Sequence, residues 1–345
     1  MAVIDRDARA NGASVRNFGF VTVTGQQRGE TWRRAMRSRD VWLEVAKAAR
    51  IDVLQRGLLM IARRPAAHAV LEEFMTSEMG ADCRLLDPTE IAEKWTGLRT
   101  SEFSGALYSP HEVRVESRQA IPQLAAYLTE RCGVTFLRET VALSAAPPRL
   151  ETSRGPVEAE IVIVCPGDDF ATLLSERIAR YGLVRCKLQM MRVLPEGFDE
   201  RLPPIMSDLG MIRYLGYAEL PAATALRERL AAEQAEHIRN GVHLIAVRSA
   251  DGTLIVGDSH HYDATPDPFA PTGVDQLILD EYARVFEASP PRPVEHWTGV
   301  YASSADRSAL IDKPSDALRI VIITSGTGAS TSFAIAEEVI GDLYS

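Results

Sequence analysis

An acidic residue closes a short apolar run at the start of the chain, and a loop rich in backbone donors follows it. In the segment "AVIDRDARANGASVRNFGF", a strand-like stretch at residues 2–5 ends at Asp5. In a dinucleotide-binding fold, an acid at the end of the second strand binds the adenosine ribose, about 20 residues after a glycine-rich turn that holds the pyrophosphate. No such turn precedes Asp5 here. Two interpretations are open: a cofactor domain without its first strand, or a chance resemblance at an ordinary N-terminus.

A second candidate site is a turn of small residues near the other end of the chain. The segment "ALRIVIITSGTGAS" runs from an aliphatic strand into small residues at 326–330, and a helix pattern follows. The N–H groups and partial positive charge of a helix N-terminus bind a phosphate or the pyrimidine edge of a flavin. Because short glycine turns also join strands to helices in many α/β proteins, a purely structural role stays open.

Cationic and titratable side chains in the middle of the chain are candidates for holding an anion. His260 and His261 follow an aliphatic strand in "TLIVGDSHHY", and Lys187 and Arg213 precede them in the chain. Histidines at strand ends are more often surface or core hydrogen-bonding groups, and single cations are usually solvated. The adjacent histidines before a tyrosine are the most specific signal of this set.

Composition limits the classes of partner. The chain has 345 residues, is 46% hydrophobic and 25% charged, and carries a net charge of -9. This charge argues against general nucleic-acid binding, because phosphate contacts need a basic face, and it favours small molecules. No apolar run is long enough to span a membrane, and no signal peptide is recognisable, so we expect a cytoplasmic protein without membrane insertion.

The cysteines give no sign of a metal site or a disulfide framework. The four residues Cys83, Cys132, Cys165 and Cys186 are widely spaced and form no CxxC pair. Buried, reduced thiols are the simpler interpretation, and the sequence predicts no metal ion.

The elements at the two ends of the chain differ from those in the middle. Helices are expected at residues 30–49 and 117–132, and "EAEIVIVCPG" is typical of a parallel strand buried on both faces. In the middle, "LVRCKLQMMRVL", "VHLIAVRS" and "TLIVGDSHHY" indicate antiparallel strands, the last two joined as a hairpin. A mostly polar segment, "LPAATALRERLAAEQAEHIRN", indicates a surface helix. This pattern predicts a discontinuous α/β cofactor domain and an α+β domain with a mixed sheet.

In the order of its motifs, the chain resembles the D-amino-acid-oxidase-like FAD-dependent oxidoreductases, the group that contains glycine oxidase and sarcosine oxidase. The matching segments are "VIDRDARANGASVRNFG", "RVESRQAIPQLAAYL", "EAEIVIVCPGDDF", "TLIVGDSHHY" and "SGTGASTSFAIAEE". They are similar to the acid-ended second strand, the Arg-x-x-Pro helix, the strand that closes over the cofactor, the Ile-Gly-x-Thr strand and the final glycine turn of the family. A subgroup associated with organophosphonate breakdown is the nearest that the resemblance suggests.

The resemblance implies an FAD/NAD(P)-binding Rossmann-like domain and a substrate domain. We expect the cofactor domain at residues 1–50, 111–180 and 300–345, and the substrate domain at 51–110 and 181–299. The family begins with a strand, a Gly-x-Gly-x-x-Gly turn and a helix, roughly 30 residues that this chain lacks. A start site placed too far downstream is the simplest explanation, and we expect this polypeptide to bind FAD poorly or not at all.

The resemblance also assigns cofactor contacts. Asp5 is expected to bind the ribose, the loop at residues 14–17 to face the pyrophosphate, and the turn at residues 326–329 to face the flavin ring. The expected set is Asp5, Arg6, Ser14, Arg16, Asn17, Gly167, Gly326, Gly328 and Ala329.

One departure from the family bears on the substrate. In "HWTGVYASSADRS", Tyr301 stands where amino-acid-oxidising members have an arginine that binds the substrate carboxylate. The family chemistry is hydride transfer from the carbon beside an amine to the flavin, giving an imine that water hydrolyses, with oxygen or another acceptor reoxidising the flavin. Without the arginine, a small amine with another anionic group is expected, an aminophosphonate first of all. Its candidate site residues are His260, His261, Tyr301, Lys187 and Arg213.

Three alternatives stay open. The first is a glycine- or sarcosine-type oxidase whose arginine has moved, to Arg16 or Arg213. The second is a cofactor-free, inactive relative that uses the substrate domain for binding alone. The third is a protein that binds NAD in place of FAD, which the mixed-sheet middle and the motif order disfavour.

Overall fold

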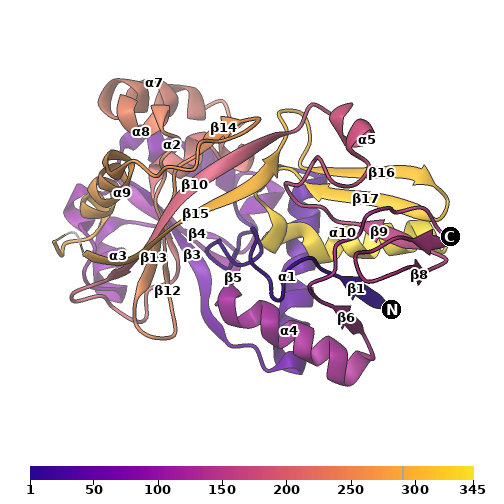
Figure 1. The fold of residues 1–345 in the computed structure, drawn as a ribbon. Coiled ribbons are helices and arrows are strands. Elements are labelled where there is room, and N and C mark those ends of the chain that lie inside the picture. The colour runs from indigo at the N-terminus through magenta and orange to yellow at the C-terminus, as the bar shows by residue number, and fades with distance from the viewer. Residues whose placement is uncertain (290) are drawn as a thin grey trace.

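Within residues 1–289 and 291–345, which the computed structural model describes, the largest element is a mixed sheet of ten strands (Figure 1). Eight strands follow one another across it: β14 (His261–Asp263), β10 (Val184–Leu194), β13 (Leu254–Gly257), β12 (Ile245–Arg248), β11 (Ile205–Met206), β3 (Val53–Ala62), β5 (Gly105–Val115) and β2 (Phe20–Val21). Two more join at the side: β15 (Arg292–Ser303) pairs with β10, and β4 (Arg84–Leu86) pairs with β5.

The predicted antiparallel middle of the chain is confirmed. β12 and β13 form a hairpin in which Arg248 pairs with Leu254, and β13 also pairs with β10. Gly252 in the turn has a φ of 81°, a conformation that glycine adopts without steric cost.

Both faces of this sheet are buried because apolar residues occupy alternate positions along its central strands. In β3, Leu58 and Met60 contribute to one core cluster, and Leu59 and Ile61 contribute to another. The first cluster includes residues of α2 (Pro65–Met75) and α7 (Ala223–Glu233), and the second includes residues of α3 (Pro88–Lys94) and α9 (Thr272–Val285).

Shorter helices complete this part of the molecule. They are α6 (Leu215–Ala218), α8 (Ala235–Arg239) and three 3-10 turns, η1 (Glu78–Gly80), η2 (Thr100–Glu102) and η3 (Asp208–Ile212). The predicted surface helix is α7, whose Leu226 and Leu230 are fully buried while its polar face is exposed.

The other part of the molecule contains smaller sheets built from the two ends of the chain and from residues 135–164 (Figure 1). In the described residues, β16 (Ala309–Ser315), β17 (Leu318–Ile323) and β9 (Val162–Val164) form one sheet, with β17 and β9 parallel. β1 (Ala2–Ile4) and β6 (Thr135–Leu137) form a separate parallel pair. A third small sheet consists of β7 (Arg149–Leu150) and β8 (Val157–Glu158), and α5 (Ser175–Ala179) follows β9 in the chain.

The prediction that the strand of "EAEIVIVCPG" is buried on both faces is wrong. Val162 and Val164 of β9 are buried, but Ile163 between them is 38% exposed. The alternation of buried and exposed residues shows that one face of β9 is covered and the other is open, and β9 also stands at the edge of its sheet with β17 as its neighbour. β1 is likewise partly exposed.

Helices α1 (Glu30–Ala49) and α10 (Gly328–Leu343) pack against each other, with α4 (Ser117–Cys132) beside them. The Trp42 ring meets Phe333 edge-on at 5.1 Å, and its Nε1 donates to the Ala329 carbonyl at 2.8 Å. The arginines of α1 are not all solvated: Arg34 is buried and forms a two-pronged ion pair with Glu338. These contacts fix the N-terminus of α10.

Some strand pairings agree with the predicted division into domains, whereas two strands of the large sheet cross a predicted boundary. β17 pairs with β9 and β16, as a strand of the cofactor domain would. β5 and β15, however, each continue through a predicted boundary, at residues 111 and 300, while staying in the ten-stranded sheet. The division stays a prediction. No helix among the described residues is long and apolar enough to cross a membrane.

Candidate active site

The candidate active site is one face of the ten-stranded sheet where β10 meets its two edge neighbours. Cys186 of β10 lies opposite Tyr301 of β15 on one side and opposite Tyr262 of β14 on the other. Residues directly opposite each other in an antiparallel pair point to the same face, so these three side chains are neighbours. Cys186 is fully buried, Tyr301 is partly buried, and Tyr262 is 52% exposed.

Arg213, which directly follows η3, reaches the same face. Its guanidinium donates to the Tyr262 hydroxyl at 2.7 Å and lies 6.0 Å from the centre of the Tyr262 ring. Within the part of the chain that the structure describes, Arg213 forms no ion pair, since no carboxylate oxygen comes within 4.0 Å of it. Asp258 lies near enough to interact with the charge of Arg213 but forms no direct ion pair with it. A partly buried arginine without a direct carboxylate partner is suited to hold an anionic ligand.

Tyr301 also connects this face to the predicted cofactor turn. Gly326 has a φ of 70°, and a Cβ built on it would lie 3.0 Å from Cζ of the Tyr301 ring. Glycine is favoured there, because the positive φ strains any other residue and a Cβ would crowd the Tyr301 ring. Burial raises the pKa of Tyr301 well above its usual range, so its hydroxyl stays protonated and can donate a hydrogen bond.

The turn ends at the N-terminus of α10, which has no side-chain cap. Gly328 and Ala329 are its first two residues, and they are partly exposed. Uncapped N–H groups at a helix N-terminus attract negative charge, including the polar edge of a flavin. Gly326, Gly328 and Ala329 therefore fit the predicted cofactor role.

Lys187 and His261 lie on the other face of the sheet. They occupy paired positions in β10 and β14, one residue along from Cys186 and Tyr262, so their side chains point the opposite way. The Lys187 ammonium donates to the carbonyls of Asp267 and Phe269 at 2.9 and 2.7 Å and to the Asp267 carboxylate at 3.0 Å. All three of its donors are thus used within the protein.

His260 lies on neither of these faces. It is buried in the segment that follows β13. Its Nδ1 lies 2.9 Å from the Gly241 carbonyl, and its ring stacks on His243 with centroids 5.2 Å apart. Burial lowers the pKa of both histidines well below the usual range and raises the pKa of the neighbouring Asp258 to about 7. The structure thus separates the five predicted substrate residues: Arg213 and Tyr301 share a face, and His260, His261 and Lys187 do not join them. Whether each contacts substrate stays a prediction.

Two of the N-terminal cofactor candidates lie beside the turn that follows β9. Asp5 accepts a hydrogen bond from Arg138 at 2.8 Å, and Arg6 forms an ion pair with Asp169. Gly167 in that turn has a φ of 63° and open space where a Cβ would be. Arg6 thus reaches the turn that contains Gly167, and Asp5 directly precedes Arg6 in the chain. The second Asp5 oxygen accepts from the Asp7 N–H.

The loop at residues 14–17 is fixed to the sheet and to α4. The Asn17 carboxamide oxygen accepts from the Gly19 N–H at 2.6 Å and from the Ser117 hydroxyl at 2.7 Å. Arg16 donates to the Thr298 carbonyl of β15 at 3.5 Å, while Ser14 is exposed. Asn17 is thus engaged in holding the loop, and the exposed part of this loop offers Ser14 and backbone groups.

These segments are the residues that would hold FAD. Asp5, Arg6 and Gly167 form one group, and Gly326, Gly328 and Ala329 form a second that contacts Tyr301. Bound FAD accepts the hydride of the reaction, whereas the chain orients the substrate. The second group fits the polar edge of the cofactor through its uncapped helix end, and the first offers a carboxylate that is shared with Arg138.

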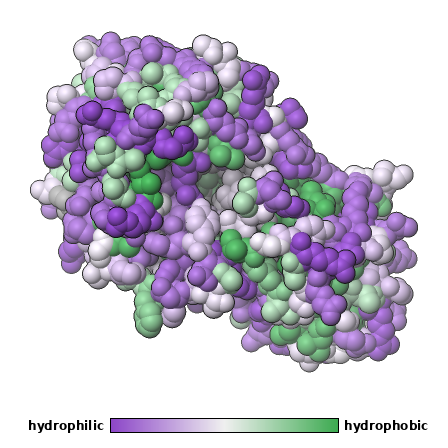
Figure 2. All heavy atoms as spheres, turned by 90° about the horizontal axis from the view of Figure 1, so that it is seen from above, coloured by the Kyte–Doolittle hydropathy of each residue, from purple (hydrophilic) through white to green (hydrophobic). Residues whose placement is uncertain are grey.

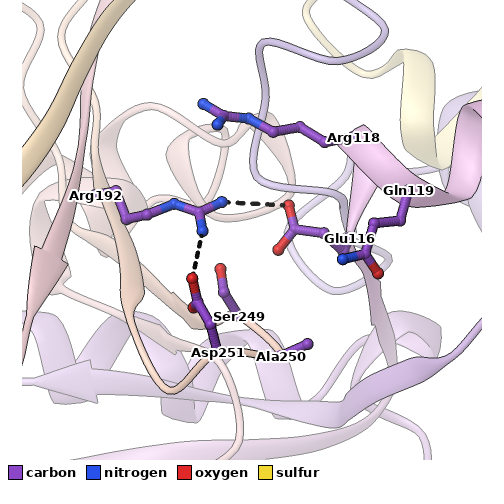
Figure 3. Close-up of a pocket in the computed structure, with 7 residues that line it drawn as sticks. All are labelled: Glu116, Arg118, Gln119, Arg192, Ser249, Ala250 and Asp251. Atoms are coloured by element: carbon purple, nitrogen blue, oxygen red, sulfur yellow. Dashed lines mark hydrogen bonds and ion pairs between the residues drawn. The ribbon is translucent and has the colours of Figure 1, made fainter.

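A cavity of about 400 Å³ lies elsewhere, between the N-terminus of α4, β10 and the β12–β13 hairpin (Figure 3). Arg192 crosses it and forms ion pairs with Asp251 at 2.9 Å and Glu116 at 3.8 Å. Because its charges are balanced by one another, this cavity is less suited to a charged substrate than the Arg213 face. Figure 2 shows a mostly hydrophilic surface that is hollowed between the two parts of the molecule.

Sequence reasoning missed several residues of these sites. Tyr262 was seen only as a neighbour of the two histidines, and Asp258, His243 and Gly241 were not singled out. Strand alternation was the available signal: in "HHY", His261 and Tyr262 must point to opposite faces of a strand.

Known proteins with a similar fold are FAD-dependent oxidoreductases and related enzymes. A family model described as FAD dependent oxidoreductase matches residues 1–341. Glycine oxidase from Geobacillus kaustophilus is similar in structure, with a TM-score of 0.77 and 18% sequence identity, over 99% of this chain and 87% of that chain. Glycine oxidase from Bacillus cereus has a TM-score of 0.75 and 16% identity, over 99% and 88% of the two chains.

A third structure extends the range of relatives. L-proline dehydrogenase from P. horikoshii has a TM-score of 0.76 and 18% identity, over 97% of this chain and 84% of that chain. No match was found among curated protein sequences. At these identities the structural neighbours establish the fold, whereas the family model covers nearly the whole chain. The chain belongs to the DAO family of FAD-dependent oxidoreductases.

Proposed function

We propose that this oxidoreductase oxidises the C–N bond of a small amine whose anionic group is held by Arg213, with an aminophosphonate as the first candidate substrate. The observation that carries the proposal is the environment of Arg213. Its guanidinium has no carboxylate partner among the described residues, and it lies on the face that Tyr301 shares with the Gly326 turn.

The donors on this face suit a tetrahedral anion. Arg213 supplies charged N–H groups, and Tyr262 and Tyr301 supply hydroxyl groups that burial keeps protonated. A phosphonate has three oxygens and accepts hydrogen bonds from several separate donors, whereas a carboxylate is best bound by one planar fork. We therefore propose that Tyr301, in the position of the family arginine, favours the phosphonate.

The reaction follows from the family. Bound FAD would accept a hydride from the carbon beside the amine, and with the loss of a proton from nitrogen this would leave an imine that water hydrolyses to a carbonyl compound and ammonia or an amine. Oxygen or another acceptor would then take the electrons. The chain contributes orientation: Arg213 fixes the anionic end, so that the carbon beside the amine faces the turn at residues 326–329.

The domain assignment belongs to the same proposal. Residues 1–50, 111–180 and 300–345 would hold the cofactor, and residues 51–110 and 181–299 would carry most of the substrate contacts. Asp5, Arg6, Ser14, Arg16, Asn17 and Gly167 would contact the adenosine and pyrophosphate end of FAD.

A glycine- or sarcosine-type oxidase is the second candidate. It is supported by the likeness in fold to two glycine oxidases and by Arg213, which could itself fork onto a carboxylate. The two candidate functions predict different preferences: Arg213, Tyr262 and Tyr301 would bind a phosphonate better in the first and a carboxylate better in the second.

The test is a comparison of kcat/KM for an aminoalkylphosphonate and its carboxylate analogue. It uses the wild type and the variants Arg213→Gln, His260→Ala and His261→Ala, each reconstituted with FAD, and the flavin absorbance of each protein is measured first because weak FAD binding is expected. We expect the phosphonate to be preferred by the wild type and the preference to be lost in Arg213→Gln. If the wild type prefers the carboxylate and Arg213→Gln has the same kcat/KM as the wild type, the proposal is wrong.

A further inference from the structure

We propose that His243, Asp258 and His260 form a binding site for a divalent cation of the zinc class. One ligand atom from each of the three residues lies within 4.8 Å of the others, and all three residues are buried. His260 was one of the predicted substrate residues, but its ring points away from the face of Arg213 and Tyr301 and into this buried cluster, which adjoins Arg213.

The local backbone brings the three side chains together. The His243 N–H donates to the Asp258 carbonyl at 3.1 Å, which places His243, two residues before β12, beside Asp258, the residue after β13. His260 follows two positions later and packs against Gly241, where a Cβ would lie 2.8 Å from Cβ of His260. A side chain at position 241 would therefore displace His260 from the cluster.

The donor spacings match those around a small cation. His243 Nδ1 is 3.3 Å from one Asp258 oxygen, and His260 Nε2 is 3.6 Å from the other. Ligand bonds of about 2.0–2.1 Å in a tetrahedral zinc site separate adjacent donors by about 3.3 Å. Two imidazoles and a carboxylate are ligands that zinc and the other late first-row divalent ions accept.

Buried polar atoms of the cluster that lack a hydrogen-bond partner are a second, independent observation in favour of a bound cation. Both ring nitrogens of His243 and one carboxylate oxygen of Asp258 are buried without a hydrogen-bond partner in the described structure. Leaving buried polar atoms unpaired costs about 1–3 kcal/mol each, and a cation between them would satisfy one nitrogen and the oxygen together.

His260 is already held as a metal ligand usually is. Its Nδ1 is 2.9 Å from the Gly241 carbonyl, so a proton on Nδ1 is donated there and Nε2 is left facing Asp258. Metal-binding histidines commonly donate their second ring N–H to a carbonyl in this way. Burial also keeps both imidazoles neutral, which is the form that binds a cation.

The opposing charge near the cluster is that of Arg213, which interacts electrostatically with Asp258 and with both histidines. Its positive charge weakens the attraction of a second cation to Asp258. Removing this charge should therefore tighten cation binding, whereas removing a ligand should weaken it. Adventitious binding at the surface would show neither the tighter binding without Arg213 nor the weaker binding without a ligand, so these two effects identify the proposed site.

The experiment measures Zn²⁺ binding to the purified 345-residue chain by calorimetry and by metal analysis after desalting, and it records the visible spectrum with Co²⁺. The variants are His243→Ala, His260→Ala, Asp258→Asn and Arg213→Gln. His296→Ala is the matched control, because His296 forms an exposed pair with Asp275 at 3.2 Å that could bind zinc adventitiously. Circular dichroism of each variant reports whether it is folded.

We expect stoichiometric Zn²⁺ in the wild type and a tetrahedral Co²⁺ spectrum. Each ligand variant should bind Zn²⁺ more than about tenfold more weakly, Arg213→Gln a few-fold more tightly, and His296→Ala equally well. The proposal is overturned if the wild type retains no Zn²⁺ or if folded Asp258→Asn binds it as tightly as the wild type. If the histidine variants do not fold, Asp258→Asn, which keeps the shape of the side chain, decides between these outcomes.

Discussion

Arg213 and Tyr262 are joined by a hydrogen bond of 2.7 Å from the guanidinium to the phenol oxygen. This contact holds an arginine without a carboxylate partner in the described structure on the face where Tyr301 meets Gly326. The account of substrate binding depends on this relationship, because an already paired arginine would have to give up its partner before it bound a substrate anion.

Replacing Arg213 with Gln should weaken binding of 2-aminoethylphosphonate by about 10–100-fold, because hydrogen bonds to charged groups contribute about 1.5–3 kcal/mol. Calorimetry measures this without need of turnover. Arg149→Gln is the control, since Arg149 is exposed and forms an ion pair with Glu151. Equal affinity in wild type and Arg213→Gln would exclude Arg213 as the anion site.

Replacing Tyr301 with Phe should have a smaller effect, a loss of about 2–10-fold in affinity for the phosphonate, because one neutral hydrogen bond is removed while the ring contact with Gly326 is kept. The same titration with the carboxylate analogue should change less. A larger loss for the carboxylate would show that Tyr301 does not favour the phosphonate.

Gly326→Ala should destabilise the fold by about 1–3 kcal/mol, because residue 326 has a positive φ and its new Cβ would meet the Tyr301 ring at 3.0 Å. Gly328→Ala is the matched comparison: the nearest atom to its Cβ is Cδ1 of Ile323, at an ordinary 3.8 Å. Urea unfolding monitored by circular dichroism measures both. Similar free energies of unfolding for the two variants would contradict the assigned contact.

The cysteines should react unequally with a thiol reagent near pH 8. Burial raises the pKa of Cys83 and of Cys186 to about 11, so their thiolate forms are scarce at that pH. The prediction that the thiols are buried is wrong for Cys132 and Cys165, which are exposed. We expect Cys132 to be labelled rapidly in the native protein, Cys165 more slowly because desolvation raises the pKa of its thiol, and Cys83 and Cys186 only after denaturation, with the sites read by peptide mass spectrometry. Raising the pH toward 11 should speed the reaction of Cys186 if the reagent can reach it. Rapid labelling of Cys186 at pH 8 would show that this face is more open than the structure indicates.

Local sequence patterns were sufficient for much of the fold. Asp87, Pro88 and Glu90 are typical of a helix start with a capping box, and the structure has both reciprocal hydrogen bonds of that box. Two apolar runs joined by a short turn indicated the β12–β13 hairpin. Such signals involve residues within a few positions of one another, so no knowledge of distant contacts is needed.

The candidate site depends on contacts that are distant in the sequence. Tyr262 and Tyr301 become neighbours only because β14 and β15 both pair with β10 around Cys186. Lys187 was a reasonable anion ligand by residue type, but the register turns it to the other face, where Asp267 and Phe269 use its donors. The sheet register is determined by packing of the whole chain and is not evident from any single segment.

Burial of the histidines was unpredictable for a similar reason. A histidine at a strand end is usually exposed or half-exposed, and His261 fits that description. His260, its neighbour, is covered because Gly241 leaves room for its ring beside His243. The absence of a side chain at position 241 therefore matters as much as the histidines themselves.

Anaerobic reduction of the flavin is the most direct test of the central claim that this oxidoreductase oxidises an amine whose anionic group is held at Arg213. The FAD-loaded protein is mixed with 2-aminoethylphosphonate without oxygen, and the flavin absorbance is followed in a single turnover. The account predicts bleaching in the wild type that is faster than with the carboxylate analogue, glycine or sarcosine, and strongly slowed in Arg213→Gln at the same substrate concentration. Bleaching by a carboxylate amine at the same rate in wild type and Arg213→Gln, with none by the phosphonate, would contradict it.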